Sequence, residues 1–216
     1  MSASTTTTAA VAGDHSFFWR RLHSLTGIFP VGFFLLEHLF SNAFVLRGAE
    51  AYNAQVKFLV GMPLVVGMEI AFIYLPILYH GLYGVYIWWR GDSNVFSYGW
   101  LGNWLYTAQR LTGLVTLAFI VFHTWEQRFS GVHLLEHPEQ AFDKVNQSLA
   151  NPLILWFYVV GIVCACFHFA YGLWLFGCKW GITPGPHAQR VSGVLCAAFG
   201  VALAGLGLAS LRAFLG

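Results

Sequence analysis

Charged residues are scarce in this chain of 216 residues. Asp, Glu, Lys and Arg make up 9% of it, whereas a soluble protein contains about 25%. Hydrophobic residues make up 57%, and the mean hydropathy is +0.63. This composition excludes an ordinary soluble domain and predicts an α-helical membrane protein with several spans. The net charge of +2 gives no reason to expect a nucleic-acid partner.

The sequence also lacks several chemical signatures. No C-x-x-C-H motif occurs, which excludes covalent attachment of a c-type haem. No phosphate-binding loop, nucleotide fingerprint or flavin site is recognisable. The cysteines lie in or at the ends of apolar segments, where small buried side chains are expected. They are Cys164, Cys166, Cys178 and Cys196.

Five apolar segments approach or exceed the ~20 residues that cross the hydrocarbon core. They are expected at about residues 22–46, 63–89, 107–126, 152–178 and 191–211. The predicted fold is an all-α integral membrane protein with a bundle of five transmembrane helices, formed by one membrane domain over residues 15–216. Residues 1–14 are rich in Ser, Thr and Ala, lack the features of a signal peptide and are expected to form a flexible tail.

Basic residues set the expected orientation of the spans. The Arg20-Arg21 pair precedes the first span and favours a cytoplasmic N-terminus, because the first helix usually dominates the topology. The inner side then holds Arg20, Arg21, Arg90, Arg110, Lys179 and Arg190, and the outer side holds Arg47, Lys57, Arg128, Lys144 and Arg212.

Four of the apolar segments each carry one deep histidine: His38, His80, His123 and His168. An ionisable side chain inside a membrane is costly and usually marks a functional site. Each histidine lies roughly 24–26 Å along its helix from the expected start of the span. Spans one and three run outward, and spans two and four run inward. His38 and His123 are therefore expected to meet near the outer face, and His80 and His168 near the inner face.

Two imidazoles that project from facing helices at one depth are suited to bind a haem iron from opposite sides. We therefore expect two b-type haems, one at each level. Zinc is disfavoured, because one pair per level supplies too few ligands for a four-coordinate site. The alternative for each histidine alone is a hydrogen-bonded packing residue. Small residues that could make room for the haems are Gly27, Gly32, Gly81, Gly84, Gly113, Gly161 and Gly172.

A short repeat opens spans one, three and five. Residues 25–27 read Leu-Thr-Gly, residues 110–113 read Arg-Leu-Thr-Gly, and residues 190–193 read Arg-Val-Ser-Gly. The simpler interpretation is a cationic anchor followed by a small residue that permits close helix packing. The alternative adds cationic partners for acidic cofactor groups at that surface.

Several stretches carry a resemblance to a known family. They are residues 20–27, 37–39, 80–86, 109–113, 123–126 and 168–174. In this order they resemble the dihaem cytochrome b membrane anchor of type-B succinate dehydrogenases and fumarate reductases, over about residues 16–210. The resemblance implies that His38 and His123 ligate the haem far from the soluble subunits, and that His80 and His168 ligate the near one.

The resemblance also implies partners and a location. A flavoprotein subunit with FAD and an iron–sulfur subunit would dock on the cytoplasmic face, over the loop of residues 91–108 and the span starts. The location would be the bacterial cytoplasmic membrane, with menaquinone bound near the distal haem. The implied function is the cytochrome b subunit of succinate:menaquinone oxidoreductase, in the respiratory chain and the tricarboxylic acid cycle.

Three further residues are expected near the propionates of the inner haem. His23 and Ser24 match family positions there, and Lys179 follows His168 by three turns on the same helix face. Arg110 and Arg190 are also within reach. The alternative is that all of these are interfacial residues whose charged or polar ends face water.

Three carboxylates, Glu37, Glu69 and Glu126, fall in the outer half of the spans. Because quinone reduction consumes protons, a carboxylate beside the outer haem is a suitable proton relay. We assign this role to Glu69. The alternative is an acid paired with Arg47 or Arg128, which we favour for Glu126.

Two other functions stay open on the sequence alone. One is a dihaem quinone-linked anchor of another dehydrogenase, such as a hydrogenase or a formate dehydrogenase. The other is a haem-free proton-coupled transporter whose histidines and glutamates line a proton path.

Overall fold

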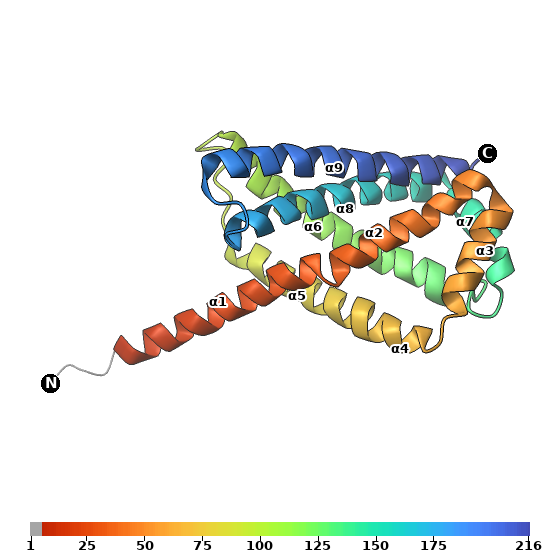
Figure 1. Cartoon of the computed structure of the whole chain (residues 1–216), viewed down its shortest axis with the longest axis horizontal. Helices are drawn as coiled ribbons and strands as arrows, with labels where there is room; N and C mark the ends of the chain where they lie inside the picture. The colour runs from red at the N-terminus through yellow and green to blue at the C-terminus, as the bar shows by residue number, and fades with distance from the viewer. Residues whose placement is uncertain (1–5) are drawn as a thin grey trace.

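The computed structural model describes residues 6–216, with side chains from Ser16 onward. This part of the chain is helical, with no strand (Figure 1). Five helical segments are long and apolar enough to cross a membrane: Ser16–Arg47, Val65–Arg90, Leu101–Phe129, Pro152–Lys179 and Gly185–Ala213. The predicted five-span helical fold is confirmed. Most of the helices extend a few residues beyond the predicted spans, because a helix can continue into the polar interface.

The first span is divided at Pro30. Helix α1 covers Thr6–Ile28, and α2 covers Val31–Asn42. Proline has no backbone N–H and disfavours a helical conformation in the residue before it, so the helix is interrupted there. Residues 1–5 of the expected tail lie outside the described residues. The structure continues α1 back to Thr6, through a segment whose alanines favour helix.

Two of the other spans contain a π-helical turn. The second consists of α4 (Val65–Glu69), the π-turn η2 (Ile70–Tyr74) and α5 (Leu75–Arg90). The third consists of α6 (Leu101–Thr124) and the π-turn η3 (Trp125–Phe129). Such turns are rare and often occur at functional sites. The last two spans are α8 (Pro152–Lys179) and α9 (Gly185–Ala213).

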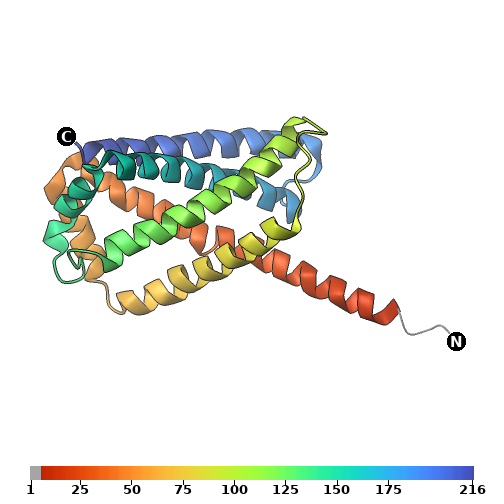
Figure 2. The same ribbon diagram turned by 180° about the vertical axis from the view of Figure 1, so that it is seen from behind.

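Helix α8 packs against both α6 and α9, and α1 packs against α5 and α8. The bundle has two different ends (Figures 1 and 2). At the end that we name the cap end, the short helices α3 (Ala49–Val60) and α7 (Ala141–Leu149) lie beside the C-terminus. At the opposite end, named the loop end, residues 91–100 and 180–184 connect the spans, and α1 projects beyond the bundle.

The cap end contains the larger cluster of buried apolar side chains. Ala141, Val145 and Leu149 recur every four residues on one face of α7 and are buried. They share the cluster with side chains from the spans, including Tyr158 and Leu211. The side chain of Asn53 joins α3 to α7 by accepting from the backbone N–H of Phe142 at 2.8 Å. Apolar packing and this hydrogen bond therefore connect the spans and the short helices at the cap end.

Candidate functional site

The four predicted histidines form two pairs inside the bundle. The ring centres of His38 and His123 are 5.6 Å apart, and the ring planes are inclined by 79°. The ring centres of His80 and His168 are 6.2 Å apart, at 83°. We name His38 and His123, toward the cap end, the outer pair, and His80 and His168, toward the loop end, the inner pair. The structure brings together the partners that the depth argument expected.

Both rings of the inner pair bond to backbone carbonyls of neighbouring helices. The Nδ1 atom of His80 is 3.0 Å from the carbonyl oxygen of His23. The Nδ1 atom of His168 is 2.9 Å from the carbonyl oxygen of Gln109. A carbonyl oxygen only accepts, so each Nδ1 carries the proton. The Nε2 atoms are consequently the ones available to a metal.

A glycine makes each of these contacts possible. Within a helix, the carbonyls of His23 and Gln109 accept from the N–H groups four residues later, which belong to Gly27 and Gly113. A Cβ on Gly27 would lie 2.4 Å from Cε1 of His80. A Cβ on Gly113 would lie 2.8 Å from Cε1 of His168. The missing side chain therefore lets each ring reach the second lone pair of the carbonyl.

The same arrangement occurs a third time without a histidine. The indole Nε1 of Trp174 donates to the carbonyl of Gln189 at 2.8 Å, and a Cβ on Gly193 would lie 3.2 Å from that nitrogen. A Thr or Ser hydroxyl before each glycine also donates to the shared carbonyl, as Ser192 does at 3.1 Å. The repeat found in the sequence thus orients a ring from the neighbouring helix, a role that neither interpretation of the repeat included.

The outer pair is held by side chains instead. The Nδ1 atom of His123 is 3.1 Å from the hydroxyl of Tyr158 on α8. The Nε2 atom of His38 is 3.2 Å from the amide nitrogen of Asn42, which also donates to the carbonyl of His38 at 2.8 Å. The ring of Phe119 stacks beside His123, with 5.6 Å between centres. The orientation of the outer rings therefore depends more on the identity of neighbouring side chains.

The spacing within each pair is close to that of two imidazoles on one haem iron. A metal–imidazole bond is about 2 Å long and the ring centre lies about 1 Å behind the nitrogen, which places two opposed ring centres roughly 6 Å apart. Beside the inner pair, Nδ1 of His23 and Oε1 of Gln109 are buried and have no hydrogen-bond partner among the described residues. Unpartnered buried polar atoms are costly, so a group that bonds to them would stabilise this region.

The residues expected near the inner propionates lie in different surroundings. The ring of His23 stacks on His80, with centres 4.1 Å apart. Ser24 is partly buried on α1, and Lys179 is exposed at the last position of α8. Arg110 instead closes the C-terminal end of α5, donating to the carbonyls of Trp88 and, at 2.9 Å, Gly91. Arg110 thus has a structural role that its sequence position did not reveal.

The carboxylates of the outer half have separate partners. Glu69 forms an ion pair with Arg128 at 2.6 Å, which connects the two spans that contain π-turns. Glu126 bonds to neither arginine that we expected for it. It accepts from the hydroxyls of Tyr158, at 2.6 Å, and of Ser148. The preferred interpretation of Glu126 as an acid paired with Arg47 or Arg128 was therefore wrong.

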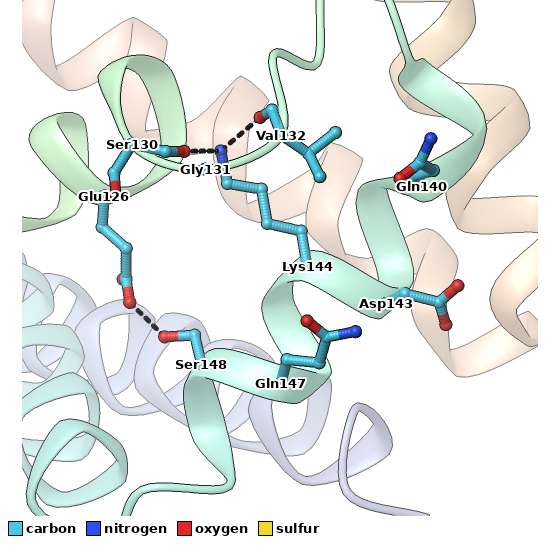
Figure 3. A pocket seen from close by; sticks show the side chains of 9 residues that line it. All are labelled: Glu126, Ser130, Gly131, Val132, Gln140, Asp143, Lys144, Gln147 and Ser148. Carbon is cyan, nitrogen blue, oxygen red and sulfur yellow. Dashed lines mark hydrogen bonds between the residues drawn. The ribbon is translucent and has the colours of Figure 1, made fainter.

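A pocket of about 350 Å³ lies at the cap end next to Glu126 (Figure 3). The amino group of Lys144 borders this pocket and donates to the carbonyls of Ser130 and Val132, at 2.8 and 2.7 Å. Burial lowers the pKa of Lys144, and the nearby Glu126 carboxylate opposes that shift. Glu126 therefore lies between the histidine level and a polar cavity.

These features define a class, the multi-span helical membrane proteins that hold paired imidazoles at two levels. Residues 92–207 match the family described as succinate dehydrogenase/fumarate reductase transmembrane subunit. The chain is 42% identical over 204 residues to the succinate dehydrogenase cytochrome b558 subunit of Bacillus subtilis (strain 168), which covers 94% of this chain and 100% of that protein. The chain belongs to the family of succinate dehydrogenase/fumarate reductase transmembrane subunits.

Membership confirms the resemblance drawn from the sequence. The chain is a cytochrome b membrane subunit of a succinate dehydrogenase or fumarate reductase, and succinate is oxidised elsewhere in the complex. The match favours this assignment over the two functions left open above, an anchor of another dehydrogenase and a haem-free transporter.

Proposed function

We propose that this chain binds two b-type haems and passes electrons from an iron–sulfur subunit to menaquinone. The outer pair, His38 and His123, would hold the distal haem, and the inner pair, His80 and His168, the proximal haem. A b-type haem supplies one-electron redox chemistry between these partners. The chain supplies the ligands, orients them and excludes water from the space between the helices.

The observation that carries this proposal is the geometry of the two pairs. Ring centres 5.6 and 6.2 Å apart agree with the spacing of roughly 6 Å for opposed imidazoles on one metal. Backbone carbonyls hold the inner rings in the tautomer that leaves Nε2 available. His23, Ser24 and Lys179 would bind the propionates of the proximal haem, and the unpartnered Nδ1 of His23 supports this role.

The loop end supports the docking of the partner subunits. Large apolar side chains of the connecting loop are exposed there, among them Phe96 at 96% and Trp100 at 71%. An exposed apolar group of this kind typically marks an interaction surface. We propose that the flavoprotein and iron–sulfur subunits cover this end on the cytoplasmic side, with the N-terminus cytoplasmic and the complex in a bacterial inner membrane.

Glu69 would deliver protons to menaquinone near the cap end. Its carboxylate lies between two π-turns, and the side chain is 22% exposed, so it is accessible from outside the bundle. The ion pair with Arg128, which was the alternative given for this residue, fixes its position and does not by itself indicate a relay. A Glu69→Gln variant should keep both haems and lose most quinone reduction by the purified complex. Full quinone turnover in that variant would contradict this role.

The central test is the haem content of the purified complex. A reduced-minus-oxidised absorbance spectrum should give two b-type haems per chain, and His80→Ala and His123→Ala should each remove one haem with a different spectrum. His187→Ala, which changes a histidine outside both pairs, is the matched control and should retain both haems. A parent protein without haem, or two variants that lose the same spectral component, would overturn the proposal.

A further inference from the structure

A chain of hydrogen bonds runs from the outer pair to the cap-end pocket. His123 contacts the hydroxyl of Tyr158 through Nδ1 at 3.1 Å. Tyr158 is buried on α8 and donates to the Glu126 carboxylate at 2.6 Å. Ser148, on α7, donates to the other oxygen of that carboxylate at the wall of the pocket (Figure 3). Three helical segments thus contribute to one continuous polar array.

The direction of these bonds follows from the donors available. Tyr158 has one hydroxyl proton, and an ionised carboxylate can only accept, so that proton points to Glu126. The tyrosine oxygen is then an acceptor for His123 and for the side-chain amide of Gln127, which is 3.1 Å away. His123 must therefore carry its proton on Nδ1, which leaves Nε2 for the iron.

No neighbouring cation in the described part of the chain forms an ion pair with Glu126. Among the described side chains, no basic group lies within ion-pair distance of the Glu126 carboxylate. The nearby Arg128 is bound to Glu69 instead. The amino group of Lys144 is occupied by backbone carbonyls, including that of Gln127 at 2.9 Å. The carboxylate accepts instead from neutral donors, so its negative charge polarises the Tyr158 hydroxyl.

We propose that Tyr158 and Glu126 are positioning residues that fix the tautomer of His123, make it a more basic ligand and thereby lower the midpoint potential of the distal haem. This inference rests on the proposed ligation by the outer pair. A hydrogen bond from the distant ring nitrogen to a polarised acceptor increases electron donation by the imidazole. Greater donation stabilises the ferric state over the ferrous state. The inner ligands bond to neutral carbonyls and lack this contribution.

The test is a redox titration of each haem in the purified complex. His123→Ala first assigns the distal signal by removing it. Tyr158→Phe deletes the bridging hydroxyl, and Glu126→Gln removes the charge at nearly constant size. In each variant, the ratio of reduced to oxidised distal haem at a fixed potential should rise about tenfold. This corresponds to a midpoint potential that is higher by about 59 mV for one electron. The proximal haem should not shift.

Three further measurements separate this role from a purely structural one. The double variant should equal either single variant, because the two residues act in series. Glu126→Asp should restore part of the low potential, and the electron paramagnetic resonance signal of the distal ferric haem should change with the potential. Tyr171→Phe is the matched control: it removes another tyrosine hydroxyl of α8 and should leave both potentials unchanged.

Several outcomes would overturn the inference. Unchanged distal potentials in Tyr158→Phe and Glu126→Gln, with both haems present, would do so without affecting the proposed function. Equal shifts at both haems would show a general change of structure instead. If Tyr158→Phe fails to assemble, Glu126→Gln decides alone. A parent protein that lacks the distal haem would overturn both the inference and the proposed function.

Discussion

The inner and outer histidine pairs occupy the same bundle but are oriented by different kinds of partner. His80 and His168 bond to backbone carbonyls, which any residue at those positions would supply. His123 bonds to the side chain of Tyr158, and His38 to that of Asn42. The inner level therefore depends on where glycine permits close approach, whereas the outer level depends on particular polar side chains.

The largest effect should come from adding a side chain at the inner level. In Gly27→Ala the new Cβ would lie 2.4 Å from Cε1 of His80, so the ring must move off its carbonyl. We expect loss of the proximal haem and retention of the distal one, measured by absorbance of the purified complex. The expected loss occurs although alanine favours a helix over glycine by about 1 kcal/mol.

Gly205→Ala provides the matched control for that substitution. A Cβ on Gly205, in α9, would have no heavy atom within 4 Å. This variant should keep both haems and be at least as stable as the parent. Retention of the proximal haem in Gly27→Ala would show that the close approach is not needed for ligation.

The second effect should appear at the cap end in alkaline solution. Burial raises the pKa of Tyr52 to about 12, against about 10 in an unfolded chain. The unfolded state therefore loses this proton first, and stability falls as the pH rises from about 10 to 12. The full contribution is about 2 to 3 kcal/mol. Since Tyr52 belongs to the buried cluster around Tyr158, the distal haem should be lost before the proximal one.

The alkaline effect can be isolated by one substitution. In Tyr52→Phe, the loss of the distal haem should depend less on pH in this range. The loss is measured by haem absorbance after incubation in detergent at each pH. Tyr98→Phe, at an exposed position of the loop end, should leave the dependence as in the parent. An identical pH profile in parent and Tyr52→Phe would refute the assignment.

The smallest effect should come from removing the Thr26 hydroxyl, which bonds to the same backbone carbonyl as His80 of the inner pair. Thr26 donates to the carbonyl of His23 at 3.1 Å and competes there with His80. Thr26→Val keeps the shape and removes the competitor, so the His80 bond should strengthen. In a redox titration, the ratio of oxidised to reduced proximal haem at a fixed potential should rise about twofold. This change is opposite in sign to the effect of Tyr158→Phe on the distal haem. A shift toward reduced would contradict this account.

The levels of the histidines could be predicted because helix rise and span direction are regular. Sixteen or seventeen residues place a side chain at a definite depth, whatever its neighbours are. The partners of the polar residues could not be predicted in this way. Arg128 and Glu126 are two residues apart, yet one bonds to Glu69 on another span and the other to Tyr158. Such choices depend on how each helix is rotated, and a π-turn at Trp125–Phe129 changes that rotation locally.

The short helices of the cap end could not be predicted from the sequence either. Helix α7 is nine residues long and lies in a polar stretch, and its signal is only the spacing of Ala141, Val145 and Leu149. The repeat that ends in Gly27, Gly113 and Gly193 was visible, but its role requires knowing which ring lies opposite each glycine. That information belongs to the tertiary packing.

The carbonyl contacts of the inner pair have a consequence for cofactor assembly. His80 and His168 are already oriented by the helices, so binding there requires little further ordering of side chains. At the outer level, the amide of Asn42 has to leave Nε2 of His38 before that nitrogen can bind iron. On the proposed ligation, the inner site should therefore be filled first during biogenesis and the outer site afterwards.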